Sequence, residues 1–324
     1  MNTNSSTLSK RSLGGTDIKV TPIGLGGNKF SGGKGVYGMM MPDLSQEQVN
    51  GIIKTALDGG INWFDTAEIY GFGHSEQGIA NALIAAEIQD DGVIVATKWN
   101  PILRSAGNIS KTIDKRLHFL GGYHIDLYMV HFPWGFSSPE AEMDAMADLV
   151  EAGKISSIGV SNFSAKQMRR AHAALEKRGL HLAVNQVQYS LLYRNIETNG
   201  VLDAAQELGV TIIAWGPLAS GLLTGKFHKD PAVFEQTPFA RRISLKRNIE
   251  RSRPMIEKLD EVAARYDVSP SQVAVNWLVN FHGETVVAIP GASKAEHARQ
   301  SAGAMKFRLS DDDMALLDEI SRRY

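Results

Sequence analysis

Short apolar runs that alternate with amphipathic stretches are the feature of this sequence that most constrains its fold. The runs are apolar at nearly every position, which is typical of parallel strands covered on both faces. We therefore expect eight strands joined by helices. They are Ile23–Leu25, Ile61–Phe64, Gly92–Thr97, Ile125–Val130, Ile155–Val160, Leu182–Val187, Thr211–Trp215 and Thr285–Ile289.

Capping residues mark where several of the intervening helices begin. Ser45 stands three residues before Gln48, which is a capping-box pattern. Ser164 and Ser269 are N-cap candidates, and Pro270 follows the second of them. Seven helices are expected: Ser45–Asp58, Ser75–Ala86, Ile109–Leu120, Pro139–Ala152, Ala165–Lys177, Asn199–Leu208 and Ser269–Asn280.

Eight strands alternating with helices over about 270 residues predict a (β/α)8 TIM barrel. The segment Leu13–Ile18 surrounds a Gly-Gly turn, so an N-terminal β-hairpin should precede the barrel. The competing architecture is a doubly wound sheet, which usually has a glycine-rich dinucleotide loop after its first strand. The one such motif, Gly33–Gly38, lies past the strand with no helix directly after it, which favours a mobile glycine-rich loop.

The domain organisation follows from the extent of this pattern. Residues 1–10 are polar and are expected to be a disordered N-terminal lead, while 11–324 form a single barrel domain with long βα loops. The stretch Lys226–Arg253 carries charged residues, Pro and Phe with no clear period. We expect it to be one of the long loops, of the kind that often acts as a lid.

Charge and composition exclude several classes of protein. The chain has 34 Lys and Arg against 35 Asp and Glu, so nucleic acid and anionic membranes are not expected partners. No apolar run is long enough to span a membrane, and residues 1–10 lack the apolar segment of a signal peptide. The sequence has no cysteine, which excludes disulfides, a thiol nucleophile and cysteine-ligated metals. A cytoplasmic enzyme fits these observations.

Polar residues stand where three consecutive predicted strands end. They are Asp65, Lys98 and His131, and Tyr70 follows Asp65 by five residues. The carboxyl ends of barrel strands meet at one rim, so these side chains should lie close together. Later strand ends bring Ser161, Asn162, Gln186 and Trp215 to the same rim.

The chemistry of the first four residues points to proton donation. A Tyr hydroxyl has a pKa of about 10, which is too high for an efficient donor near neutrality, and a neighbouring Lys ammonium lowers it. A carboxylate would position that Lys, and a His would orient a substrate oxygen. Together they form a general acid for a carbonyl that receives hydride, and no metal is required.

Each of these residues has a simpler interpretation when taken alone. A strand-end Asp is usually a cap, a Lys is usually solvated and a His is usually structural, so only their joint occurrence favours catalysis. Other catalytic patterns fail: no P-loop and no His-Glu-x-x-His motif occurs, and the nine His lack zinc-ligand spacing. The segment Gly159–Phe163 begins like a nucleophile elbow, but Phe163 replaces its second Gly.

The sequence resembles the aldo-keto reductase superfamily in ordered motifs that extend from about Gly14 to Leu317. This resemblance implies a (β/α)8 barrel, a nicotinamide cofactor bound without a Rossmann fold, and carbonyl reduction. By this resemblance, Tyr70 is the proton donor and Lys98 lowers the pKa of Tyr70. Asp65 pairs with Lys98, and His131 orients the carbonyl. The motifs are Asn62–Gly71, Ala96–Lys98, Asp126–His131, Lys154–Phe163, Asn185–Tyr189 and Ile289–Ala292.

The resemblance also implies the cofactor contacts and predicts NADPH (NADP+) as the cofactor. The nicotinamide carboxamide would contact Ser161, Asn162 and Gln186, with Trp215 stacked on the ring. The loop 217–226 resembles the pyrophosphate loop of the bacterial and potassium-channel-β-like branches, and barrel phosphate sites form after strands seven and eight. The contacts expected there and at the adenosine end are Pro217, Leu218, Ser220, Gly221, Leu223, Lys226, Gly291, Ser293, Lys294, His297 and Gln300. At the last two positions and at Ser301, the well-known reductases carry an Arg and a Glu-Asn pair instead.

Two other functions remain open at this point. One is an NADP(H)-sensing regulatory subunit, because potassium-channel β subunits share these motifs. The other, a metal-dependent barrel hydrolase, needs more ligands than Asp65 and His131.

The expected partner is a small carbonyl substrate, and the aromatic residues expected to line the substrate site predict an apolar or aromatic compound. Oligomeric state is open, since members occur as monomers and as closed homo-oligomeric rings. The candidate lining residues are Phe30, Tyr37, Trp99, Phe132 and Trp134.

Overall fold

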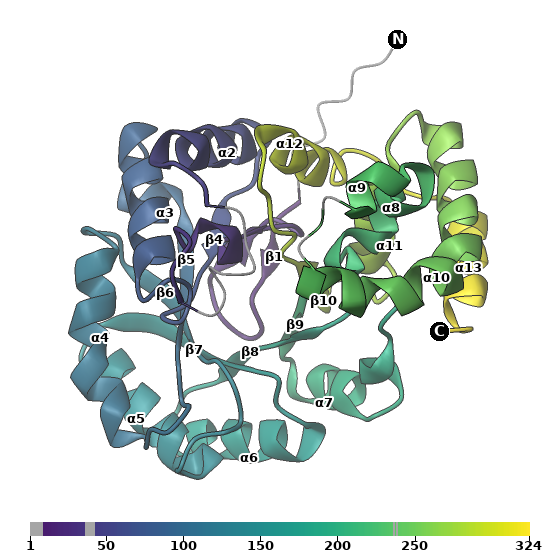
Figure 1. Cartoon of the computed structure of the whole chain (residues 1–324). Coiled ribbons are helices and arrows are strands. Elements are labelled where there is room, and N and C mark those ends of the chain that lie inside the picture. Colours follow the sequence, from purple (N-terminus) through teal and green to yellow (C-terminus); the bar gives the residue numbers. More distant parts are fainter. Residues whose placement is uncertain (1–8, 36–42, 236, 238) are drawn as a thin grey trace.

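The computed structural model describes residues 9–35, 43–235, 237 and 239–324 (Figure 1). Most of the predicted N-terminal lead, residues 1–8, lies outside this part of the chain. Tyr37 and the end of the glycine-rich motif also lie outside it. The domain boundaries therefore stay a prediction.

Eight parallel strands form one sheet whose order follows the chain from β3 to β10. The sheet closes on itself, because the Gly24 N–H donates to the Ala288 carbonyl at 2.9 Å and the Gly26 N–H to the Pro290 carbonyl at 3.1 Å. The predicted (β/α)8 barrel is therefore confirmed. Its strands are β3 Leu25–Gly26, β4 Trp63–Asp65, β5 Ile94–Trp99, β6 Ile125–Val130, β7 Ile155–Ser161, β8 Leu182–Gln188, β9 Thr211–Trp215 and β10 Val286–Ala288.

The predicted hairpin precedes the barrel and pairs β1 Arg11–Ser12 with β2 Lys19–Val20 in antiparallel register. Its Leu13 and Val20 belong to the cluster that fills the barrel interior. The Gly14 N–H donates to Thr211 Oγ1 at 2.8 Å, and Trp63 Nε1 donates to the Thr21 carbonyl at 3.0 Å. Both contacts join this end of the chain to the amino ends of strands, so the hairpin caps the bottom of the barrel.

Helices surround the strands, as Figure 1 shows. The seven predicted helices are all present with ends within a few residues of those expected, and the capping boxes at Ser45, Ser164 and Ser269 all form. They are α2 Gln46–Asp58, α3 His74–Ala85, α4 Gly107–Phe119, α5 Pro139–Glu151, α6 Ala165–Glu176, α7 Val201–Leu208 and α11 Pro270–Asn280. A further helix, α12 Ala295–Gly303, begins after β10 as the phosphate-site argument requires.

The prediction of a long irregular loop over Lys226–Arg253 was wrong. This stretch forms α8 Lys226–Lys229, α9 Pro231–Glu235 and the first half of α10 Phe239–Tyr266. Charged residues and Pro254 inside α10 obscured its period. Among the described side chains of α10, only Leu245 and Ser252 are buried before Met255, and buried residues recur at close helical spacing from Met255 onward. The C-terminal helix α13 Asp311–Ser321 was not predicted either.

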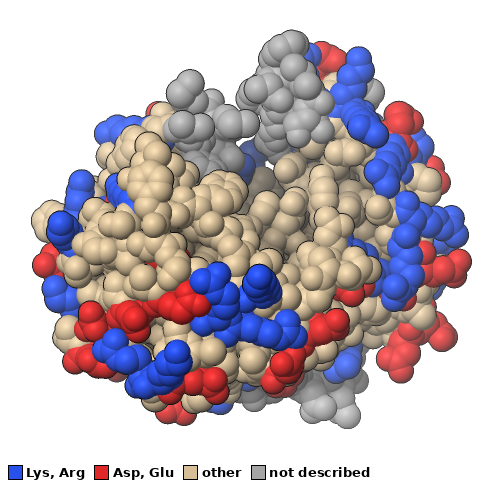
Figure 2. Space-filling view, turned by 90° about the horizontal axis from the view of Figure 1, so that it is seen from below, with Lys and Arg blue, Asp and Glu red and all other residues tan. Residues whose placement is uncertain are grey.

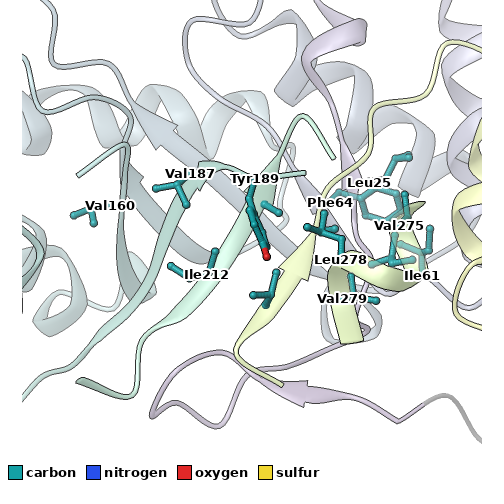
Figure 3. Packing of buried hydrophobic residues seen from close by; sticks show 14 of the residues in the cluster. Leu25, Ile61, Phe64, Val160, Val187, Tyr189, Ile212, Val275, Leu278 and Val279 are labelled. Atoms are coloured by element: carbon teal, nitrogen blue, oxygen red, sulfur yellow. The ribbon is translucent and has the colours of Figure 1, made fainter. Parts of the chain in front are cut away.

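The buried apolar residues form two separate clusters, one on each side of the barrel wall. The inner cluster includes Trp63, Ala96, Leu127 and Met129. The outer cluster lies between strands and helices, and Figure 3 shows part of it. Successive residues of a strand face opposite sides, so strands such as β4, β6 and β10 supply both clusters in alternation.

Candidate active site

Strand alternation places the predicted catalytic residues on the inner face of the barrel. Trp63 and Ala96 face the interior, so Asp65 and Lys98, two residues further along β4 and β5, face it as well. The same step takes Met129 of β6 to His131. The three side chains therefore share the inner face at the carboxyl ends of adjacent strands, as predicted from the strand ends.

Asp65 and Lys98 form an ion pair that is almost completely buried. Lys98 Nζ lies 2.6 Å from Asp65 Oδ2 and also donates to the Thr66 carbonyl at 2.8 Å. Burial raises the pKa of Asp65 and lowers the pKa of Lys98, and the contact between the two opposes both shifts. The pair fixes the ammonium group at one point of the rim.

Tyr70 lies beside this ion pair and is 8% exposed. Lys98 Nζ is 5.3 Å from the centre of the Tyr70 ring, and the Tyr70 ring meets His131 edge-on at 5.6 Å between centroids. Gly71 follows with φ +71°, and a Cβ there would lie 2.2 Å from the Ser31 carbonyl oxygen. Only glycine allows the chain to turn so closely after Tyr70.

His131 is buried, and its pKa lies well below the ordinary value because of burial and the nearby Lys98 cation. Its imidazole is therefore neutral at physiological pH and carries one N–H. Nδ1 of His131 is buried with no hydrogen-bond partner among the described residues. The ring stacks on Phe132 at 4.2 Å, and Phe132 stacks on Trp134 at 4.7 Å. A short aromatic stack thus leads from the site to the surface.

A hydrogen-bonded network from the next strands joins this group. Gln186 Nε2 donates to Asp65 Oδ1 at 2.8 Å, and Ser161 Oγ donates to the Gln186 carbonyl at 2.8 Å. Asn162 Nδ2 donates to Ser161 Oγ at 3.0 Å, and Trp215 Nε1 donates to Asn162 Oδ1 at 3.0 Å. The structure therefore brings together the four residues expected at the nicotinamide.

The expected pyrophosphate loop follows β9 and contains a 3-10 segment, η4 Ala219–Thr224. Ser220 and Gly221 have left-handed backbone conformations inside it, with φ of 57° and 90°. Such turns direct successive N–H groups toward one side, which suits an anion. Ser220 and Lys226 are exposed, whereas Pro217 and Leu223 are buried and shape the loop from beneath.

Three lysines from separate segments approach His297 of α12. Burial lowers the pKa of His297, and the charges of Lys226, Lys294 and Lys29 lower it further. Lys294 is the N-cap of α12 and has no side-chain capping bond. Gln300, by contrast, accepts from Ser271 Oγ at 3.1 Å and donates to Glu296 Oε1 at 3.3 Å. The lysines make this corner of the rim cationic.

Asn28 and Lys29 were not predicted from the sequence as site residues; they belong to η1 Asn28–Phe30, which follows β3. Asn28 Oδ1 is buried without a hydrogen-bond partner among the described residues. It would lie 3.0 Å from a Cβ placed on Gly291, one of the expected cofactor contacts. A signal was available, because this polar pair comes just after the first barrel strand, separated from it by Gly27, much as Asp65 ends the second.

Two of the predicted substrate-lining residues do not line the site. Trp99 is fully buried, and its Nε1 donates to Asn108 Oδ1 of α4 at 3.1 Å. It faces outward because Lys98, the residue before it on β5, faces inward. Phe30 is also buried in the outer cluster. Phe132 is half-buried and Trp134 is 62% exposed, so these two remain candidates.

Other features of the described residues do not compete with this site. Within these ranges, no group of three or more His, Asp or Glu is placed to hold a metal ion. No helix in the described part of the chain is long and apolar enough to cross a membrane. A cavity of about 640 Å³ lies between hairpin residues such as Asp17 and the segment before β5, at the opposite end of the barrel. Basic and acidic side chains are interspersed on the face that Figure 2 shows.

The structure thus brings Asp65, Lys98, His131 and Tyr70 together at the carboxyl rim of a closed parallel barrel. The chain belongs to the aldo/keto reductase family, whose model matches residues 22–322. An aldo-keto reductase of Schizosaccharomyces pombe, named for NADP(+), is 32% identical over 291 residues, with 86% of this chain and 83% of the relative covered. The predicted resemblance to the superfamily is confirmed, while the particular branch stays a prediction.

Solved structures give the same result. The glycerol dehydrogenase of Gluconobacter oxydans matches with a TM-score of 0.82 and 27% identity, covering 98% of this chain and 96% of that one. An aldo-keto reductase of Klebsiella pneumoniae, solved in complex with NADPH, matches with a TM-score of 0.73 and 26% identity. That match covers 97% of this chain and 95% of the other.

Proposed function

We propose that this protein is an NADPH-dependent reductase of aldehydes or ketones in which Tyr70 is the general acid. The observation that carries the proposal is the buried Asp65–Lys98 pair, whose ammonium lies 5.3 Å from the Tyr70 ring beside a neutral His131. An ammonium at this distance favours the phenolate, which makes the Tyr hydroxyl a better proton donor. Purified protein should oxidise NADPH when a carbonyl compound is added, and an unchanged NADPH absorbance across a broad panel would contradict the proposal.

The chain's residues divide the proton chemistry among themselves. NADPH, when bound, supplies the hydride. Tyr70 donates its hydroxyl proton to the carbonyl oxygen as that oxygen gains negative charge, and the phenolate left behind is stabilised by Lys98. The neutral imidazole of His131 donates its N–H to the same oxygen and orients the carbonyl. Tyr70 then regains a proton from solvent, which completes the conversion of carbonyl to alcohol.

The residues present fit the cofactor. Ser161, Asn162 and Gln186 offer polar groups for the nicotinamide carboxamide, with the Trp215 indole beside them. The η4 turn and the exposed cation of Lys226 suit the pyrophosphate. The cationic corner at His297 suits the adenosine end, as does the buried Asn28 oxygen near Gly291, which has no hydrogen-bond partner within the described ranges. The names of the yeast relative and the Klebsiella complex support NADPH as the cofactor.

Lys294 should distinguish NADPH from NADH. The Lys294→Met variant is expected to lose about 1.5–3 kcal/mol of NADPH binding, the range for a hydrogen bond to a charged group, because its ammonium would contact the 2′-phosphate. NADH binding should hardly change. Fluorescence titration with both cofactors measures the difference, with the exposed Lys306→Met as the matched control. Equal losses for both cofactors, or a wild-type preference for NADH, would contradict the assignment.

Asn162 should hold the nicotinamide end. It has φ +62°, a conformation that Asn tolerates better than most residues, and its amide bonds both Ser161 and Trp215. Asn162→Ala is expected to weaken NADPH binding by about 1–2 kcal/mol, since a lost amide leaves buried partners unsatisfied. Titration of the quenching of protein fluorescence measures this, and unchanged affinity would remove Asn162 from the site.

The substrate class follows from the stack beside His131. Phe132 and Trp134 extend from the imidazole to the surface, which supports an apolar or aromatic carbonyl compound as the substrate. Comparison of kcat/KM for benzaldehyde and acetaldehyde tests this preference.

No specific observation favours the NADP(H)-sensing alternative, since Tyr70, Lys98, Asp65 and His131 are all present for the proposed proton transfer. Cytoplasmic location and homo-oligomerisation stay predictions.

A further inference from the structure

A second buried ion pair lies on the outer side of β5, directly behind the catalytic Lys98. Thr97 Oγ1 donates to Glu76 Oε1 of α3 at 2.7 Å, and Glu76 Oε2 lies 3.0 Å from Arg116 Nη1 of α4. Thr97, Glu76 and Arg116 are each no more than 1% exposed. A buried ion pair contributes little to stability by itself, because desolvation costs about as much as the attraction returns. Its presence here calls for another reason.

The pair and Lys98 are linked through the strand itself. Thr97 and Lys98 are consecutive on β5, so one side chain contacts the helices while the other faces the active site. Four buried charges therefore cross the barrel wall with alternating sign: Asp65, Lys98, Glu76 and Arg116. Such charges interact strongly because little solvent screens them.

We propose that Glu76 and Arg116 are positioning residues that hold Lys98 in its charged state from behind the barrel wall. The Glu76 carboxylate stabilises the Lys98 ammonium across β5, and Arg116 keeps that carboxylate ionised. The Thr97 hydroxyl couples the carboxylate to the strand. This inference rests on the proposed function, because a change in the charge of Lys98 is observed through the activity that depends on Tyr70.

The charges that face Glu76 fix the sign of its effect. Besides Arg116 and Lys98, the charge of Glu68 in the β4–α3 loop affects the pKa of Glu76. The buried Tyr128 of β6 also lies within the range of these charges, because Glu76, Glu68 and Arg116 all affect its pKa. Burial raises the pKa of Glu76 to about 7, and Arg116 opposes that rise. Glu76 is therefore ionised above about pH 7 and neutral well below it.

The Glu76→Gln variant tests the proposal, because Gln keeps an oxygen for the Thr97 hydroxyl and removes only the charge. Loss of the negative charge lowers the pKa of Lys98, so Lys98 becomes neutral at a lower pH and Tyr70 then loses the cation that makes it a proton donor. The alkaline limb of the pH profile of kcat should therefore move to lower pH by about 0.5–1 unit. Below about pH 6 the profiles of variant and wild type should coincide in shape. Glu76 is then protonated in the wild type and carries no charge, like the Gln of the variant.

Two further variants separate an electrostatic effect from structural damage. In Glu76→Gln/Arg116→Gln the unpaired cation is also gone, so the alkaline limb should move back toward its wild-type position. Asp313→Asn is the matched control, because Asp313 is a buried carboxylate that binds Arg265 and Tyr266 far along the chain from the site. Its profile should keep the wild-type limb.

The outcomes are decisive in either direction. An alkaline limb that stays in place in Glu76→Gln, or a rate loss that is equal at every pH, would overturn the inference. If Glu76→Gln does not fold, Thr97→Val replaces it: loss of the hydroxyl bond weakens the ionised form of Glu76, so a smaller shift of the limb in the same direction is expected. An unchanged limb in Thr97→Val would then overturn it. Retained activity in Tyr70→Phe would instead contradict the proposed function.

Discussion

The Tyr70→Phe variant is expected to lose at least about 100-fold in kcat while its affinity for NADPH stays unchanged. Phe keeps the ring that packs edge-on against His131 and removes the proton that the carbonyl oxygen requires. The expected loss is the scale of general-acid catalysis. Steady-state NADPH oxidation and fluorescence titration of the cofactor measure the two quantities separately.

A second tyrosine provides the control for this variant. Tyr123 is also buried, and its hydroxyl donates to the Ile88 carbonyl at 2.6 Å near the amino end of β6. Tyr123→Phe should therefore keep kcat within a small factor of wild type. Turnover retained in Tyr70→Phe would remove Tyr70 from the mechanism.

The Asp65→Asn variant is expected to lose both activity and stability. It leaves the fully buried Lys98 ammonium without its carboxylate partner, and breaking one side of a buried pair costs about 3–5 kcal/mol of unfolding free energy. Lys98 would then lose its proton readily and no longer favour the Tyr70 phenolate, so kcat should fall by at least about 100-fold.

The stability of Asp65→Asn should also depend on pH in a defined direction. Without Asp65, burial depresses the pKa of Lys98 in the folded state below that of the unfolded chain, and the Glu76 charge opposes this only in part. The unfolded state then binds more protons, so the variant's stability should rise with pH between neutrality and about pH 10. Urea unfolding at several pH values measures this rise relative to wild type.

A surface aspartate serves as the control for that measurement. Asp58 forms an exposed ion pair with Lys54 on α2. Asp58→Asn should change stability little at any pH, because exposed pairs contribute little. A wild-type unfolding free energy in Asp65→Asn would show that Lys98 does not depend on Asp65.

The barrel and the residues that meet at its rim could be predicted from the amino-acid sequence alone. Nearly continuous apolar runs predicted buried parallel strands, and Asp65, Lys98 and His131 each ended such a run or followed it directly. Because side chains alternate along a strand and parallel strands all end at one rim, strand position alone was enough to bring these three together. Local capping signals at Ser45, Ser164 and Ser269 likewise needed no tertiary information.

The facing of a side chain near a strand end required the folded structure, because the expected end of β5 was two residues too early. Trp99 was expected in the site, but β5 extends to include it, and the alternation turns it outward onto α4. The same is true of long-range partners: nothing local in α3 or α4 indicates that Glu76 and Arg116 meet behind Lys98. The two residues are 40 positions apart in the sequence and meet only in the folded barrel, because contact between distant helices depends on the strands that position them.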